Sequence, residues 1–139
     1  MQLADTSAWV WTRAVGGQLR EDFDGAMIEG EIAICAMVRL ELLYSTRNAD
    51  EFAQLNRDLG ALPELPLAEA QWDRAVEVYG RLAQQGGPHH RAVKHADLLI
   101  AAAGEAAGVE ILHYDKDYER IAAITGQCVR WLAPRGSLS

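Results

Sequence analysis

Apolar and polar positions follow two different periods along this chain, and the period changes repeatedly. Short stretches rich in β-branched residues, such as "EIAIC" at 31–35 and "VEILHY" at 109–114, predict strands. Stretches in which apolar residues recur every three or four positions predict helices, most plainly over 37–46, 68–85 and 93–108. Strands that alternate with helices predict an α/β fold with a central, mostly parallel sheet flanked by helices.

The remaining segments complete this alternation. Residues 1–7 begin as a short strand that ends near Asp5, and residues 127–132 form a final strand. Further helices are expected over 8–15, 19–29, 49–60 and 116–124, a short strand or turn over 62–67, and a loop over 86–91. Binding sites in such sheets form at the carboxyl ends of strands, and both Asp5 and Asp115 follow a strand end.

Two acidic residues stand on helix faces that are otherwise free of charge. Glu41 has uncharged residues one turn before and one turn after it, and Asp97 is the only acid between Ala96 and Gly104. The helix over 68–85 differs, because its acids recur every four residues opposite an apolar face. The acids Glu69, Asp73 and Glu77 predict a solvated stripe, and Trp72, Ala75, Val76, Tyr79 and Leu82 form the opposite face.

A buried carboxylate is costly unless it is paired or bound to a metal, and neighbouring carboxylates also repel one another. The residues around Asp5 and Glu41 offer only Arg39 as a basic partner, and its side chain points off the Glu41 face. A divalent cation is the other solution, and sites made only of carboxylates favour Mg²⁺ or Mn²⁺ over zinc. The candidate metal ligands are therefore Asp5, Glu41, Asp97 and Asp115, with Asp117 as a fifth candidate.

Each of these acids also has an ordinary explanation as a helix cap, a turn residue or a partnered acid. The prediction depends on all of them together. Asp5, Thr6 and Ser7 before a helix form a common cap sequence, but a cap and a ligand are compatible here. The two hydroxyl groups could hold the Asp5 carboxylate in place.

Composition indicates one packed domain over residues 1–139, because half of the residues are hydrophobic and only 24% are charged. The amino-terminal residues lack the pattern of a signal peptide, and the longest uncharged apolar run is far too short to span a bilayer. We therefore expect a cytoplasmic protein with no membrane segment. Cys35 and Cys128 lie in apolar stretches without metal-ligand spacing, and we expect both to be reduced core residues.

Four motifs resemble one known family: "LADTSAW" at the start of the chain, "VRLELLY" around Glu41, "HADLLIAAAG" around Asp97 and "HYDKDYERI" around Asp115. They resemble the PIN-domain ribonucleases, most closely the VapC toxins of bacterial toxin-antitoxin pairs. The likeness extends from the first strand to about Trp131. It implies a central parallel sheet flanked by helices, and endonucleolytic cleavage of RNA by a water molecule activated on Mg²⁺ or Mn²⁺.

The resemblance also implies a role for each acid. Asp5 and Asp97 would be the main ligands, Glu41 and Asp115 would complete the site directly or through water, and Asp117 would support them. Thr6 or Ser7 would orient Asp5. His113 departs from the pattern, because related sequences often have Thr at this place, and its role is left open.

The resemblance further implies a homodimer and a cognate antitoxin that places a basic side chain near the carboxylates. The net charge of −7 argues against binding duplex DNA by bulk electrostatics, so local basic residues matter for RNA. We expect Arg91 and Lys94 to contact RNA phosphates on one side of the acids, with Lys116 and Arg120 on the other. An ordinary solvated loop is the alternative for this basic stretch.

Two other classes of function compete with a nuclease toxin. One is a catalytically silent module that keeps the fold and binds an antitoxin or RNA, although the intact set of four acids speaks against it. The other is a phosphatase that uses Asp5 as the nucleophile, but the second aspartate that such enzymes carry two residues later is missing. The four tryptophans, Trp9, Trp11, Trp72 and Trp131, are expected as core or interface anchors rather than as base-stacking platforms.

Overall fold

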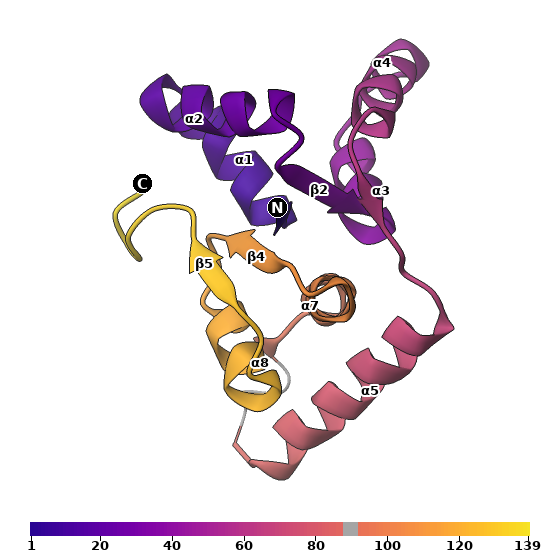
Figure 1. Ribbon diagram of the computed structural model, residues 1–139, viewed down its shortest axis with the longest axis vertical. Coiled ribbons are helices and arrows are strands. Elements are labelled where there is room, and N and C mark those ends of the chain that lie inside the picture. Colours follow the sequence, from indigo (N-terminus) through magenta and orange to yellow (C-terminus); the bar gives the residue numbers. More distant parts are fainter. Residues whose placement is uncertain (88–91) are drawn as a thin grey trace.

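The computed structural model describes residues 1–87 and 92–139, and it shows an α/β fold (Figure 1). The strands are β1 (Gln2–Ala4), β2 (Ile32–Cys35), β3 (Glu64–Leu65), β4 (Glu110–His113) and β5 (Val129–Trp131). The helices of the described residues are α1 (Thr6–Val15), α2 (Gly17–Ile28), α3 (Ala36–Tyr44), α4 (Ala49–Gly60), α5 (Glu69–Gln84), α7 (His95–Ala107) and α8 (Asp117–Thr125). Every strand and helix predicted above is present, within a few residues of its expected bounds.

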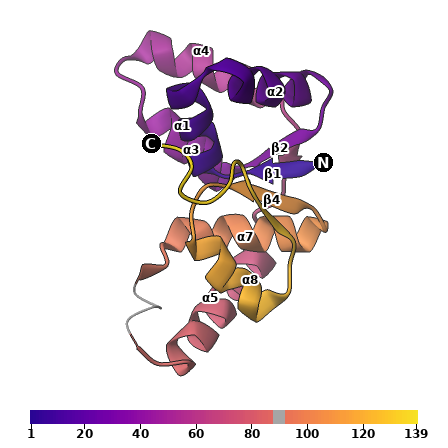
Figure 2. The ribbon, with the colours of Figure 1, turned by 90° about the vertical axis from the view of Figure 1, so that its left-hand side faces the viewer.

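The strands form one sheet in the order β3-β2-β1-β4-β5, and all four pairings are parallel. Helices α1 to α4 cover one face of the sheet and α5, α7 and α8 cover the other (Figure 2). The chain leaves β1 in one direction along the sheet and later returns on the far side of β1 as β4. The gap between the carboxyl ends of β1 and β4 is therefore the topological switch point, where α/β sheets bind ligands.

The core is built around β1, β2 and α7. All four residues of β2 are buried, and α7 is buried from Asp97 to Gly104 because it lies between the sheet and α5 (Figure 2). Gly104 permits this close approach, since a Cβ at that position would overlap Cδ1 of Ile111 on β4. Packing of this density explains why α7 reads as an almost continuous apolar run.

One sequence-based expectation about burial was wrong. Cys35 is buried as expected, but Cys128 is exposed, and it lies in the segment between α8 and β5 rather than inside the strand. On α5, only a narrow stripe of Ala75, Val78 and Leu82 packs against the core. Trp72 is 54% exposed and Val76 is 70% exposed, so part of the apolar face of α5 lies at the surface. Within the described residues, none of the helices combines the length and apolar character needed to cross a membrane.

Candidate metal centre

The candidate site is assembled at the switch point from the ends of two neighbouring strands. Asp5 directly follows β1, Asp115 follows β4, and the backbone N–H of Asp5 donates to the carbonyl of Leu112 at 3.0 Å. Ser7 strengthens this junction. Its hydroxyl accepts from the backbone N–H of Tyr114 at 2.8 Å and donates to Asp5 Oδ1 at 2.7 Å. Parallel pairing of β1 with β4 therefore determines where these two acids meet.

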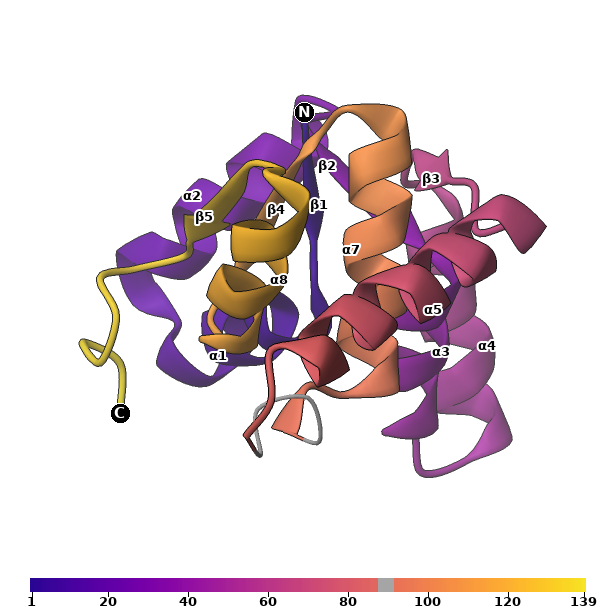
Figure 3. The same cartoon turned by 90° about the horizontal axis from the view of Figure 1, so that it is seen from below.

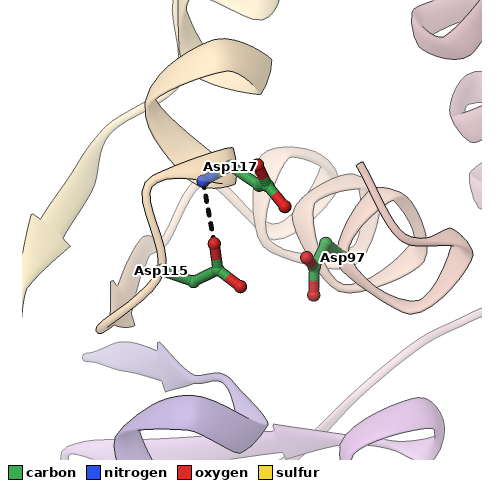
Figure 4. A group of neighbouring side chains, drawn as sticks. All are labelled: Asp97, Asp115 and Asp117. Atoms are coloured by element: carbon green, nitrogen blue, oxygen red, sulfur yellow. Dashed lines mark hydrogen bonds between the residues drawn. The ribbon is translucent and has the colours of Figure 1, made fainter. Parts of the chain in front are cut away.

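Three aspartates contributed by different segments face one another in this place. Asp97 comes from the first turn of α7, Asp115 from the loop after β4, and Asp117 from the first turn of α8 (Figure 4). One carboxylate oxygen from each lies within 4.8 Å of the other two. Oxygen atoms that converge in this way suit a hard divalent cation.

Asp97 is the most perturbed member of this group. Its side chain is 7% exposed, and burial, together with the charges of Asp115 and Asp5, raises its pKa to about 7. Its Oδ2 atom is buried and has no hydrogen-bond partner among the described residues. An unpaired buried carboxylate oxygen is unfavourable, and a cation bound there would remove the penalty.

Asp5 lies beside this group and is also buried. Its Oδ1 accepts from the backbone N–H of Ala8 at 2.9 Å, so Asp5 caps α1 as well as facing the site. Burial raises its pKa to about 6, although the hydrogen bonds from Ser7, Ala8 and Tyr118 oppose that change. The cap and the candidate ligand are thus the same side chain.

Glu41 stands apart from the three clustered aspartates. Its Oε1 accepts a hydrogen bond from the hydroxyl of Thr6 at 2.6 Å. The two hydroxyl groups that follow Asp5 therefore hold different acids. The Ser7 hydroxyl donates to Asp5, and the Thr6 hydroxyl donates to Glu41. Arg39 points away from Glu41, as expected, and pairs with Glu64 at 3.1 Å.

Asp115 and Asp117 also differ in their local roles. Asp115 Oδ1 accepts from the backbone N–H of Asp117 at 2.9 Å, so Asp115 is the side chain that steadies the start of α8. Asp117 is buried and pairs with Arg120 at 3.0 Å. Burial and the charge of Asp115 raise the Asp117 pKa. The residue that best fits a capping role is therefore Asp115, and Asp117 faces into the site.

Residues 3–124 match the family model for the PIN domain. The chain is a PIN-domain protein. It is 43% identical to Ribonuclease VapC18 of Mycobacterium tuberculosis over 134 residues, which is 96% of each chain. It is 38% identical to Ribonuclease VapC21 of the same species over 122 residues, 86% of each chain. Within the PIN domains, it therefore belongs to the VapC family.

Solved structures show the same fold. A DNA-bound VapBC from Salmonella typhimurium superimposes with a TM-score of 0.74 at 19% identity, covering 96% of this chain and 100% of that chain. VapBC2 from Rickettsia felis, bound to a promoter DNA fragment, gives a TM-score of 0.70 at 18% identity, covering 94% and 97%. At this level of identity, the likeness confirms the PIN-like architecture of the sheet and its helices.

His113, whose role the sequence left open, is a buried structural residue of this PIN domain. Its Nδ1 accepts from the backbone N–H of Asp115 at 3.1 Å, and its ring lies 5.0 Å from the ring of Tyr118 and 4.8 Å from that of Trp131. Burial lowers its pKa to about 4, so it is neutral near pH 7. A neutral imidazole at this position orients the Asp115 loop without adding charge to the site.

Sequence reasoning missed Tyr118. This residue is completely buried, and its hydroxyl donates to Asp97 Oδ1 at 3.3 Å. Burial and the nearby charges of Asp5 and Asp97 raise its pKa well above the usual value. A signal was available, because Tyr118 shares the inner face of its helix with Ile121, and a buried tyrosine hydroxyl usually has a polar partner.

The basic residues expected to contact RNA differ in their exposure and in their partners. Lys94 and Lys116 are exposed beside the first turns of α7 and α8, respectively. Arg120 is occupied by its ion pair with Asp117. Arg91 lies outside the described residues.

Proposed function

We propose that this protein is a metal-dependent endoribonuclease that acts as the toxin of a toxin-antitoxin pair. The observation that carries the proposal is the buried, unpaired Oδ2 of Asp97 within a group of acids at the switch point of the sheet. The relatives are named ribonucleases, and that name agrees with a site made of hard oxygen donors and no other obvious nucleophile.

In this proposal, Asp5, Asp97 and Asp115 would hold Mg²⁺ or Mn²⁺, and Glu41 and Asp117 would complete or support the site. A bound cation of this kind lowers the pKa of a water molecule and neutralises charge that develops on the phosphodiester. Ser7 keeps the Asp5 carboxylate oriented, and Thr6 does the same for Glu41. The carboxylates are thus placed before the ion or the RNA arrives.

The exposed ammonium groups of Lys94 and Lys116 border the acids and would contact RNA phosphates. Lys94 already lies close enough to Asp97 to lower its pKa against the effect of burial. Arg120 would reach RNA only after leaving Asp117, so we assign it a weaker role. Arg91 remains a candidate from the sequence.

We also propose a cognate antitoxin and a homodimer as partners. Solved neighbours are described as VapBC complexes, which supports an antitoxin partner. For the homodimer, an apolar groove of about 300 Å³ lies between α5 and α7, lined in part by Trp72, Val76 and Leu98. A second copy is its proposed occupant, because a two-fold dimer would bury the same groove and the same exposed residues of both chains.

The competing functions have less support. A silent binding module would have no need for an unpaired carboxylate oxygen in a buried acidic group. A phosphatase with Asp5 as nucleophile would need an acid two residues later, where Ser7 stands and holds Asp5 Oδ1. Neither competitor accounts for the geometry as well as a metal-dependent nuclease.

The deciding experiment is cleavage of total cellular RNA by purified, antitoxin-free protein with Mg²⁺ or Mn²⁺. Discrete fragments should appear, and they should vanish with EDTA or in Asp97→Asn. Asp73→Asn is the matched control, because it changes an exposed aspartate on the neighbouring helix and should leave cleavage intact. Failure of the folded wild-type protein to cut any RNA, despite binding the metal, would favour the binding module.

A further inference from the structure

The buried hydroxyl of Tyr118 approaches the acidic site from the interior of the protein. The side chain is 0% exposed, and its ring packs against the ring of His113. The hydroxyl donates to Asp97 Oδ1 at 3.3 Å, and it lies close enough to Asp5 to lower the pKa of that carboxyl. One buried hydroxyl therefore acts on carboxylates from two different elements, the end of β1 and the first turn of α7.

This contact determines which oxygen of Asp97 is available. A carboxylate rotates about a broad torsion, so a single donor is enough to select its orientation. Oδ1 is held by Tyr118, whereas Oδ2 is buried without a partner among the described residues. Asp5 is arranged similarly, since Ser7 and Ala8 both hold its Oδ1.

We propose that Tyr118 is a positioning residue of the metal centre, whose hydroxyl holds the Asp97 carboxylate so that Oδ2 faces the ion. The inference rests on the proposed function, because it presumes that the acids bind a cation. Groups that orient metal ligands in this way typically change metal affinity ten- to hundred-fold when they are removed. Replacing Tyr118 by Phe removes the hydroxyl and keeps the ring that packs in the core.

Tyr114 provides a matched control close to the same site. Its ring packs edge-on against Trp11 and Trp131, and its hydroxyl accepts from the backbone N–H of Leu138 at 2.8 Å. Tyr114→Phe therefore removes a tyrosine hydroxyl near the end of β4 without removing the donor to Asp97. Any general effect of losing a phenol near the site should appear in both variants.

The test is Mn²⁺ binding by calorimetry at pH 7.5 to the wild-type protein, Tyr118→Phe and Tyr114→Phe. We expect about tenfold weaker binding in Tyr118→Phe and unchanged binding in Tyr114→Phe. In RNA cleavage at saturating Mn²⁺, KM for RNA should stay unchanged in Tyr118→Phe. Equal Mn²⁺ affinity in all three proteins, or an equal loss in both variants, would overturn the positioning role.

A second measurement uses only the wild-type protein. In wild-type protein carrying ¹³C at tyrosine Cζ, titration with Mg²⁺ should shift the resonance of Tyr118 more than those of the other three tyrosines. An unmoved Tyr118 resonance at saturating Mg²⁺ would overturn the inference. If the wild-type protein bound neither ion, the proposed function itself would fail, whereas a wild-type protein that binds metal and cuts RNA would leave only the role of Tyr118 to be decided.

Discussion

Helices α5 and α7 pack against each other, yet their acidic residues have opposite surroundings (Figure 3). A two-pronged ion pair joins them, with Arg74 Nε 2.7 Å from Glu105 Oε1 and Nη2 3.0 Å from Oε2. The acids of the α5 stripe, Glu69, Asp73 and Glu77, are all exposed. Asp97, in the first turn of α7, is 7% exposed.

The layer in which each helix lies explains the difference. Because α7 lies between the sheet and α5, a side chain in its first turn is withdrawn from water and placed beside the ends of β1 and β4. Helix α5 is the outer layer, and its acids stay solvated. An aspartate therefore becomes a candidate metal ligand because of the layer in which its helix lies, and not because it is an aspartate on a helix.

The largest effect should come from comparing Asp97→Asn with Asp73→Asn in metal-free protein. Since the pKa of folded Asp97 is raised to about 7, the folded state binds more protons than the unfolded state between about pH 4 and pH 7. The stability contributed by Asp97 is therefore present at low pH and is lost as pH rises through that interval. Asp97→Asn should raise the free energy of unfolding by about 4 kcal/mol at pH 8, with little change at pH 4.

Urea unfolding in EDTA from pH 4 to 8 measures this effect. The pKa of His113 is lowered, so its contribution to the free energy of unfolding increases as pH rises to about 6.5, opposite to that of Asp97. The contribution of Asp97 is therefore taken as the difference between the wild type and Asp97→Asn at each pH. Asp73→Asn should stay within about 0.5 kcal/mol of the wild type throughout. Destabilisation by Asp97→Asn at pH 8 would mean that Asp97 has a structural role.

The next largest effect on the free energy of unfolding should come from replacing one glycine in each helix by alanine. Gly104→Ala on α7 should destabilise the protein by about 1–3 kcal/mol, because the new Cβ would overlap the Ile111 side chain. Gly80→Ala on α5 should stabilise it by about 0.5–1 kcal/mol, because no atom lies within 4 Å of the added Cβ. Thermal and urea unfolding of both variants would check the signs, and the same sign for both would contradict the assignment of α5 to the outer layer.

The smallest effect on the folded monomer should come from the exposed apolar face of α5. Val76 is 70% exposed, so Val76→Lys should change the free energy of unfolding by less than about 0.5 kcal/mol. If a second copy covers this face, the same change should shift sedimentation from dimer to monomer. Asp73→Lys, also on α5 but within its acidic stripe, is the control and should leave the dimer in place. A wild-type monomer at high concentration would remove the dimer proposal.

Much of the fold could be read from the sequence because the signals for it are local. The period of apolar residues predicted each strand and helix, including the helix over 93–108. Asp97 was also identifiable, since an acid on an apolar face calls for a partner. These predictions needed no knowledge of which segments meet in space.

The features that the sequence did not predict depend on contacts between distant segments. Cys128 was expected in the core, but the start of β5 leaves it exposed. Periodicity predicted the apolar face of α5, but it does not show which of its residues pack in the core and which, like Trp72 and Val76, line a surface groove with α7. The Thr6 hydroxyl holds Glu41, whereas the Ser7 hydroxyl holds Asp5, because the fold brings Glu41 close to Thr6, 35 positions earlier in the chain.

Local patterns in the sequence are therefore enough to give the order of the elements, the parallel character of the sheet and the acids that are out of place on apolar faces, because periodicity and the cost of burial act over a few residues. The tertiary structure decides the geometry of the predicted site: Asp97, Asp115 and Asp117 share one space with Asp5 beside them, whereas Glu41 is held by Thr6. It also decided that the hydroxyl of Tyr118 reaches Asp97, 21 positions away. Parallel pairing of β1 with β4 and the burial of α7 beneath α5 bring these groups together, and neither is encoded in a local pattern.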